Sequence, residues 1–163
     1  MLKLLLQVSG WLVARTPEVV LRLVAWLLGN AILVLMPRRR RLFFSNLDHA
    51  FPNRTRAWQD RIARESSCRV IETLLLSLAS PFLSDRKLTR IARVDPRLQA
   101  AYADFMASPR PVVLATVHFA YWECETWLPL LLGYPLPGTG VIFRPLDNAS
   151  ADAWLKKTRE RFG

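Results

Sequence analysis

The chain has 163 residues, a formal net charge of +10 and 52% hydrophobic residues, a length that suggests one domain. Its apolar content exceeds the roughly 45–50% of ordinary soluble domains, so a basic and apolar chain is expected to lie against something anionic: phospholipid head groups, nucleic acid or an acidic carrier protein. The two cysteines, Cys68 and Cys124, have no paired spacing, which argues against a disulfide framework or a four-cysteine zinc site.

The N-terminal residues 1–36 are dominated by Leu, Val, Ala and Trp. The stretch from Val19 to Met36 approaches the roughly 20 apolar residues that a membrane-spanning helix needs. Arg22 lies near one end of this stretch, from where its side chain can reach the membrane interface. We therefore assign residues 1–37 to a membrane-anchoring helical segment, which either spans the membrane or lies in one leaflet.

Four arginines, Arg38, Arg39, Arg40 and Arg41, come directly after Pro37. Lys and Arg clusters beside membrane helices lie predominantly on the cytoplasmic side. The position of this cluster next to an apolar segment favours contact with anionic lipid over a purely solvated charge run. The rest of the chain is accordingly predicted to be cytoplasmic.

Residues 38–108 are predicted to form a helical region, because apolar positions recur at helical spacing between prolines. Asn53 and Thr55 are both suitable N-caps for its longest helix. The expected helices cover residues 42–51, a stretch that starts after Asn53 or Thr55 and runs to Leu78, residues 88–93 and residues 98–106.

The pattern changes after Pro111. Residues 112–117 form a nearly continuous apolar run rich in β-branched side chains, which is typical of a buried strand in a parallel or mixed sheet. Further expected elements are a helix over 119–132 closed by Gly133, a strand over 140–143 and an amphipathic helix over 150–162.

These elements predict an α/β fold class: N-terminal membrane-associated helices followed by the start of a mixed or parallel sheet with flanking helices. Two strands do not make an independently stable sheet. Residues 109–163 are therefore expected to be the first part of an α/β domain that is incomplete at the C-terminus.

His118 and Glu123 are the strongest candidates for catalytic residues. His118 follows the predicted strand, at the edge where open α/β folds place their ligand sites. Histidine can take up a proton near neutral pH, and a nearby carboxylate can fix its tautomer. The spacing alone also fits a structural pair, and Cys124 is a rival nucleophile although it points about 100° away from Glu123 on a helix.

Three blocks in order resemble the bacterial lipid A acyltransferases, a branch of the lysophospholipid/glycerophosphate acyltransferase superfamily. The segment Val117-His118-Phe119-Ala120-Tyr121-Trp122-Glu123 is similar to the superfamily's His-x-x-x-x-Asp motif, with the Glu that this branch commonly has. The segment Ile142-Phe143-Arg144-Pro145-Leu146-Asp147-Asn148 is similar to the family's Tyr-Arg-Pro-x-x-Asn block. Residues 38–52 resemble its N-terminal block after the membrane helix.

The resemblance implies that residues 109–163 begin an acyltransferase domain that moves a fatty acyl chain from acyl-acyl carrier protein to a hydroxyl of a lipid A precursor or related glycolipid. It assigns His118 as general base and Glu123 as the residue that orients it. Arg144 would bind phosphate or stabilise developing negative charge, and Asn148 would help shape that site.

The implied partners are the lipid bilayer, acyl carrier protein and a glycolipid acceptor, but not nucleic acid. The implied location is the bacterial inner membrane with the catalytic part facing the cytoplasm. No metal or cofactor is implied, since the acyl donor carries phosphopantetheine on its carrier protein. The acidic carrier, the phosphates of the acceptor and the anionic leaflet would all suit a basic surface.

Other functions are also compatible with the sequence. A related acyltransferase could act on a lysophospholipid or an ornithine lipid, because the motifs concern acyl transfer rather than the acceptor. The family's later Asp-rich stretch and Phe-Phe-Gly segment have no counterpart here, so a truncated, non-catalytic membrane-associated fragment is an alternative. Nucleic-acid binding is disfavoured, because the arginines cluster beside an apolar segment and no nucleic-acid motif occurs.

Overall fold

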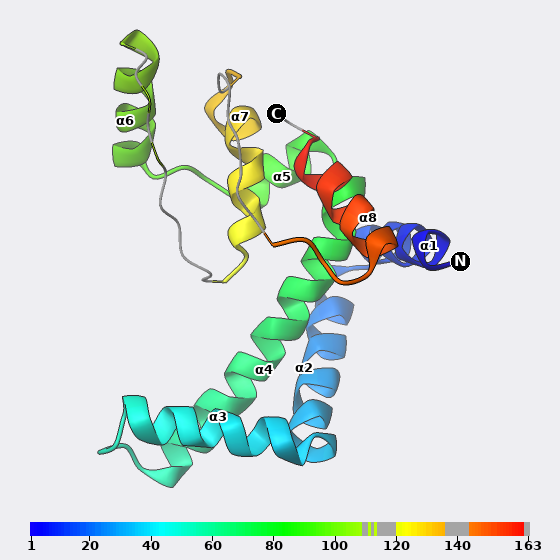
Figure 1. Cartoon of the computed structure of the whole chain (residues 1–163), viewed down its shortest axis with the longest axis vertical. Coiled ribbons are helices and arrows are strands. Elements are labelled where there is room, and N and C mark those ends of the chain that lie inside the picture. The colour runs from blue at the N-terminus through cyan, green and yellow to red at the C-terminus, as the bar shows by residue number, and fades with distance from the viewer. Residues whose placement is uncertain (109–110, 112, 114–119, 136–143, 162–163) are drawn as a thin grey trace.

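The computed structural model describes residues 1–108, 111, 113, 120–135 and 144–161, and all regular elements in these ranges are helices (Figure 1). They are α1 (Leu2–Arg15), α2 (Glu18–Leu35), α3 (Pro37–Ala50), α4 (Arg56–Ala79), the 3-10 helix η1 (Ser80–Phe82), α5 (Asp85–Ile91), α6 (Pro96–Ala107), the 3-10 helix η2 (Trp122–Trp127), α7 (Leu128–Leu132) and α8 (Ala149–Arg159).

The longest element, α4, is the scaffold of the molecule. It begins after Thr55, whose side-chain oxygen accepts a hydrogen bond from the backbone N–H of Trp58 at 3.3 Å, as an N-cap does. Both α1 and α2 pack against it. Figure 1 shows α3 crossing one end of α4, while α5, α7 and α8 gather near the other end.

Two glycines allow the N-terminal helices to approach α4 closely. A Cβ atom on Gly29 of α2 would lie 2.7 Å from the backbone nitrogen of Cys68 in α4. A Cβ atom on Gly10 of α1 would overlap the carbonyl oxygen of Leu78 and the ring of Phe82. Because no side chain fits between these backbones, glycine at both positions fixes how α1 and α2 lie on the scaffold.

The helices predicted before residue 108 are confirmed, with ends shifted by a few residues. The predicted helix over 119–132 is only partly correct, because its described part divides into η2 and α7. Pro129 explains the division: it has no N–H to donate to the carbonyl of Glu125, so an α-helix cannot continue through it unbroken. Gly133 ends α7 in the left-handed conformation, at φ 79°.

The α/β fold-class prediction is wrong, because the structure contains only helices over the residues it describes. The first predicted strand, 112–117, lies outside those residues except for Val113, which is 94% exposed and has no regular structure. The second predicted strand, 140–143, lies outside them as well. Apolar β-branched runs predict burial more reliably than conformation. Val113 is neither buried nor part of a strand.

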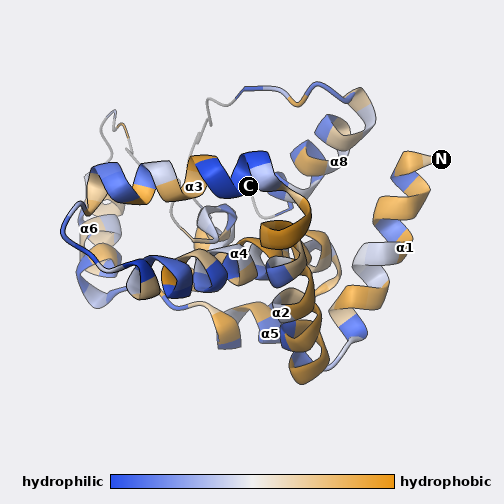
Figure 2. Cartoon of the chain, turned by 90° about the horizontal axis from the view of Figure 1, so that it is seen from below, coloured by the Kyte–Doolittle hydropathy of each residue, from blue (hydrophilic) through white to orange (hydrophobic). Residues whose placement is uncertain are grey.

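Helices α1 and α2 are rich in hydrophobic residues (Figure 2), and many of these side chains are exposed. Large exposed side chains on these two helices include Leu4, Leu5, Val8, Trp11, Leu12, Val19, Leu23, Trp26, Leu27, Val34 and Leu35. In the described residues α2 is the one helix long and apolar enough to cross a membrane, and only 11% of its apolar window is buried within the protein. A helix with this length and composition is compatible with a membrane span but does not by itself establish one.

Candidate functional site

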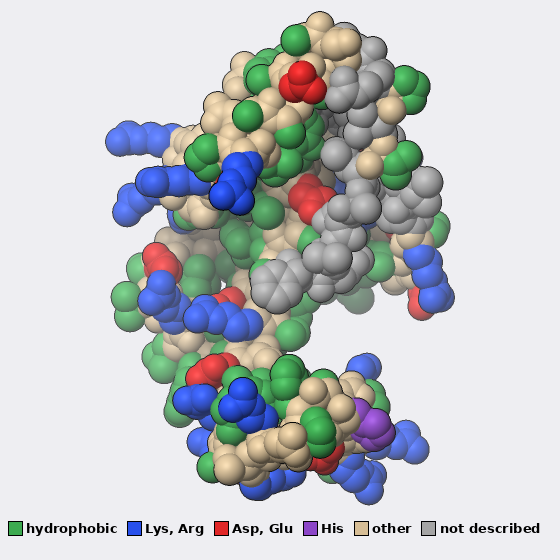
Figure 3. Space-filling model, turned by 90° about the vertical axis from the view of Figure 1, so that its left-hand side faces the viewer, with side chains coloured by type: hydrophobic (Ala, Val, Ile, Leu, Met, Phe, Trp, Pro, Cys, Tyr) green, Lys and Arg blue, Asp and Glu red, His purple; other side chains and the backbone are tan. Residues whose placement is uncertain are grey.

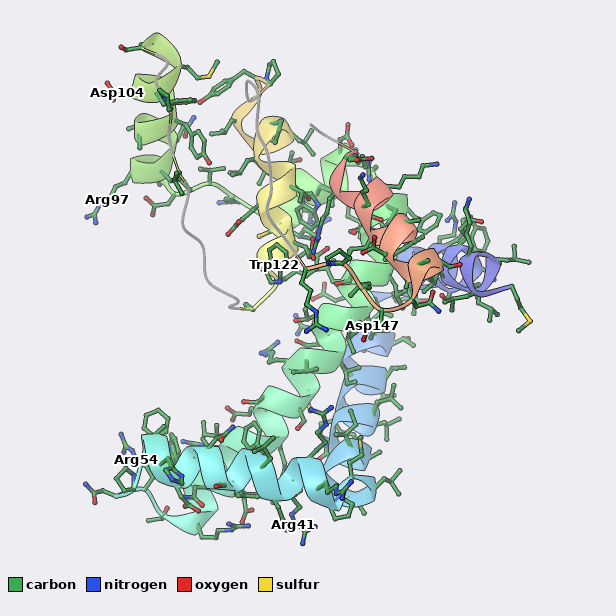
Figure 4. All side chains as sticks on the ribbon, viewed as in Figure 1. Arg41, Arg54, Arg97, Asp104, Trp122 and Asp147 are labelled. Atoms are coloured by element: carbon green, nitrogen blue, oxygen red, sulfur yellow. The ribbon has the colours of Figure 1, made fainter. Side chains whose placement is uncertain are left out.

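The structure describes only one of the two residues that were predicted to act together. His118 lies outside the described residues. Glu123 lies in η2, one residue after Trp122, which Figure 4 labels. The surroundings of Glu123 therefore define the candidate site.

An apolar cluster packs against η2. Trp127, at the end of η2, is 3% exposed and packs with Ala79, Leu83 and Leu88 from the α4–α5 region. Its ring centroid lies 5.4 Å from that of Tyr121. Because η2 is anchored at both ends by these aromatic residues, the backbone at Glu123 is held by the core.

The carboxylate of Glu123 is held by Arg159 of α8. Nε of Arg159 donates to Oε2 of Glu123 at 2.8 Å, and Nη2 donates to Oε1 at 2.6 Å. The two side chains are only 12% and 15% exposed. The guanidinium also lies over the ring of Trp122, 4.9 Å from its centroid. A shielded, two-point contact of this kind fixes both the position and the orientation of a carboxylate.

This hydrogen bond also stabilises the charged form of the arginine. The bond to Glu123 raises the pKa of Arg159 above its ordinary value, although burial opposes the increase. The Arg159 guanidinium therefore places a positive charge directly beside the Glu123 carboxylate in a shielded position.

A second arginine and a tyrosine connect the same region to the end of α4. Arg161 donates to the carbonyl oxygen of Ser80 at 2.9 Å and to Oδ1 of Asp85 at 2.8 Å. Burial raises the pKa of Tyr121 to about 12, against the opposing effect of its hydrogen bonds with Ser80 and Ser77. The Tyr121 hydroxyl is therefore a neutral hydrogen-bonding group at physiological pH.

Arg144 and Asn148, the predicted substrate-binding residues, lie on the loop before α8, close to Asp147, which Figure 4 labels. The Arg144 side chain is 89% exposed, and its Nη2 lies 3.7 Å from Oδ1 of Asp147. Asn148 is the N-cap of α8: its side-chain oxygen accepts hydrogen bonds from the backbone N–H groups of Ser150 and Ala151 at 3.0 and 3.1 Å. Arg144 is thus accessible to an anion, whereas Asn148 has a structural role whatever else it does.

Comparison with known proteins identifies the family. Residues 2–163 match the family model described as bacterial lipid A biosynthesis acyltransferase. The chain belongs to this family. It has no significant match among curated proteins or among solved structures. The family match confirms the resemblance seen in the three sequence blocks, and an acyltransferase function follows from it at the level of the family.

The structure adds one residue to the candidate site of this lipid A acyltransferase family member that the sequence did not single out. Arg159 is 36 positions away from Glu123, and no local spacing connects them. The last turn of α8 also contains Lys156 and Lys157, so a cation in this helix is no distinguishing signal. The contact forms only because α8 folds back onto η2, which the sequence does not show.

Cys124, the rival nucleophile, is free and half-buried. Burial is the main cause that raises the pKa of its thiol. Because the thiolate is the reactive form, a raised pKa makes Cys124 a poor nucleophile at neutral pH. The environment of Cys124 is that of a packed apolar residue.

Proposed function

We propose that this chain transfers a fatty acyl chain from acyl-acyl carrier protein to a hydroxyl group of a lipid A precursor or a related glycolipid. The observation that carries the proposal is the family match over residues 2–163, a range that includes the motif from His118 to Glu123. The shielded and fixed carboxylate of Glu123 supports it, because a group that orients a catalytic base must itself be rigidly held.

His118 acts as the general base in this proposal. It takes the proton from the acceptor hydroxyl as the hydroxyl oxygen attacks the carbonyl carbon of the donor thioester. The new ester C–O bond forms, the C–S bond breaks, and the phosphopantetheine sulfur leaves and receives the proton. No covalent acyl-enzyme intermediate and no metal or cofactor of the protein's own is needed.

Glu123 accepts a hydrogen bond from the other ring nitrogen of His118 and stabilises the imidazolium that forms. Arg159 occupies one hydrogen-bonding position on each carboxylate oxygen. An ionised carboxylate has about four such positions, so the contact with Arg159 is compatible with a further bond to His118. Arg144, with its exposed guanidinium, binds a phosphate of the acceptor or stabilises the developing oxyanion, and Asn148 shapes the loop beside it.

The apolar surface of α1 and α2 contacts the bilayer, and the arginines 38–41 contact anionic head groups. The location that follows is the bacterial inner membrane, with η2 and α8 on the cytoplasmic side. The partners are then the bilayer, acyl carrier protein and a glycolipid acceptor, and nucleic acid is not among them.

The test is transfer of radiolabel from acyl-acyl carrier protein to a lipid A precursor in membranes that contain the chain. We expect wild type to label the lipid, His118→Ala to abolish labelling, and Cys124→Ala to retain it. Near-wild-type turnover by His118→Ala would contradict the mechanism. Parallel assays with a lysophospholipid and an ornithine lipid as acceptors separate the two acyltransferase alternatives, and no transfer to any of them would favour a non-catalytic membrane-associated role.

A further inference from the structure

A cluster of arginines lies at the end of α4 that is farthest from Glu123. Figure 3 shows Lys and Arg side chains around the end of the molecule where α3 lies. A surface cavity of about 540 Å³ opens there between α3 and the start of α4. Its lining includes Arg40 and Arg41 from α3 and Arg56 from α4.

Phe44 brings cations from two helices together in this cavity. The Cζ atom of Arg56 lies 3.7 Å from the centroid of the Phe44 ring, and Cζ of Arg40 lies 5.8 Å from the same centroid. The ring itself is anchored, because Phe44 is 7% exposed and packs with Leu47 and Ala63. Two guanidinium groups are thus held near one fixed aromatic surface, where cation–π attraction offsets part of their mutual repulsion.

The acidic groups nearby neutralise this cluster only in part. Asp48, which also lines the cavity, accepts a hydrogen bond from Nε2 of Gln59 at 2.6 Å. Asp60 lies 3.6 Å from Nε of Arg56 but outside the cavity lining. In the described part of the chain, no carboxylate forms an ion pair with Arg40 or Arg41. The three arginines, set against Asp48 of the lining and Asp60 beside Arg56, leave an excess of one positive charge.

The location of the cavity indicates where its ligand comes from. Helix α2 ends at Leu35 and α3 begins at Pro37, which itself lines the cavity. Val34 and Leu35 are 75% and 76% exposed at the end of the apolar α2. If α2 contacts the bilayer, the cavity opens at the depth of the lipid head groups. A lipid phosphate monoester carries about −1.5 to −2 charge near neutral pH, so this positive lining attracts it more strongly than a diester with one charge.

We propose that Arg40, Arg41 and Arg56 form a binding site for the phosphate monoester of a membrane lipid. Guanidinium groups suit this ligand because each can donate two parallel hydrogen bonds to phosphate oxygens. The site lies at the opposite end of α4 from Glu123 and Arg159, so it holds the protein on a phosphorylated lipid rather than taking part in acyl transfer. The proposal rests on the membrane contact of α2 included in the proposed function, and its test reads binding instead of turnover.

The experiment measures partition of the purified full chain onto phosphatidylcholine vesicles that contain either phosphatidic acid, a monoester, or phosphatidylglycerol, a diester, at matched surface charge and fixed salt. We expect wild type to favour phosphatidic acid by about tenfold, the effect of one good charged contact. The double variant Arg40→Gln/Arg56→Gln should lose this preference. The matched control Arg38→Gln/Arg39→Gln removes the same charge from α3 outside the cavity lining, and should weaken binding to both vesicles while keeping the preference.

A further variant separates charge from geometry. Arg40→Lys/Arg56→Lys retains both charges but not the planar donors, and it should lose most of the preference while its thermal unfolding midpoint stays close to that of wild type. If the two glutamine double variants have equal effects on both vesicle types, the proposed site is wrong. Binding would then come from non-specific attraction between the basic surface and anionic lipid. Selective displacement of the protein from phosphatidic acid vesicles by inorganic phosphate, at concentrations that leave the phosphatidylglycerol vesicles bound, would support a phosphate site. Selective displacement by soluble acyl carrier protein instead would overturn the assignment of a lipid ligand.

Wild type that binds neither vesicle would contradict the membrane association on which the proposal depends. Wild type that binds both without preference would contradict the site alone. These two failures are therefore distinguishable from each other, and both are distinguishable from a failure of acyl transfer.

Discussion

The arginines at the two ends of α4 lie in contrasting environments. At the C-terminal end, Arg159 is 12% exposed and holds both oxygens of Glu123 at hydrogen-bonding distance. At the N-terminal end, Arg56 is 57% exposed, and its nearest carboxylate in an ion pair, on Asp60, lies 3.6 Å away. Both guanidiniums also lie over an aromatic ring.

The difference shows that exposure, and not residue type, separates a structural arginine from one that can bind a ligand. A buried guanidinium must have its charge and its donors matched within the protein, so it fixes its partner in place. An exposed one keeps water as an alternative partner and can exchange that water for an anion. This contrast predicts large effects on stability at one end of α4 and small ones at the other.

The largest effect is expected for Arg159→Met. The substitution leaves the Glu123 carboxylate shielded but unpaired, and the loss of one partner from a buried ion pair costs about 3 kcal/mol of unfolding free energy. Denaturant unfolding of the purified chain measures this value, with Arg56→Met as the matched control at the exposed end. A cost no larger than that of the control would contradict the structural role of the Glu123–Arg159 pair.

A double-mutant cycle sharpens the same prediction. Glu123→Gln/Arg159→Met removes both charges, so the double variant should be more stable than the sum of the two single effects implies. Simple additivity would mean that the two side chains do not interact in solution.

The next effect concerns Tyr121, which lies at the same end of α4. The pKa of its hydroxyl is about 12 in the folded protein, against 10.0 ordinarily. Because the folded pKa is raised, the contribution of the neutral hydroxyl is complete below pH 10 and is lost as pH rises from 10 to 12, by about 2 to 3 kcal/mol. The stability difference between wild type and Tyr121→Phe should fall across this window. A constant difference would show that Tyr121 is not buried as described.

A smaller effect is expected for Asn148. Asn148→Ala removes the N-cap of α8 and should cost about 1 kcal/mol, whereas Asn148→Asp keeps an oxygen acceptor and should cost much less. The pair of variants also tests the predicted role in substrate binding. If Asn148→Asp is stable but has a raised KM for the lipid acceptor, the loop before α8 contributes to acceptor binding as well as to capping the helix.

The sequence predicted local features well and long-range ones poorly. The long helix after Thr55 followed from local signals at each end, an N-cap candidate where it begins and Pro81 just after it ends. The contact between Glu123 and Arg159 depends instead on how α8 folds back, which no local pattern specifies. The sheet prediction was wrong for a related reason: whether a short apolar run forms a strand depends on neighbours that a single segment does not reveal.

The smallest effect is expected at the exposed end, and it provides the most demanding test of the comparison. Arg56→Gln removes a guanidinium that lies 3.7 Å from the Phe44 centroid, and exposed cation–π contacts contribute about 0.5–1 kcal/mol. Arg38→Gln on the same surface should leave the unfolding free energy unchanged. If Arg56→Gln instead costs as much as Arg159→Met, the arginines of the cavity are part of the core of the protein. Their free guanidinium donors could then no longer be taken as available to a phosphate, and the contrast between the two ends of α4 would fail.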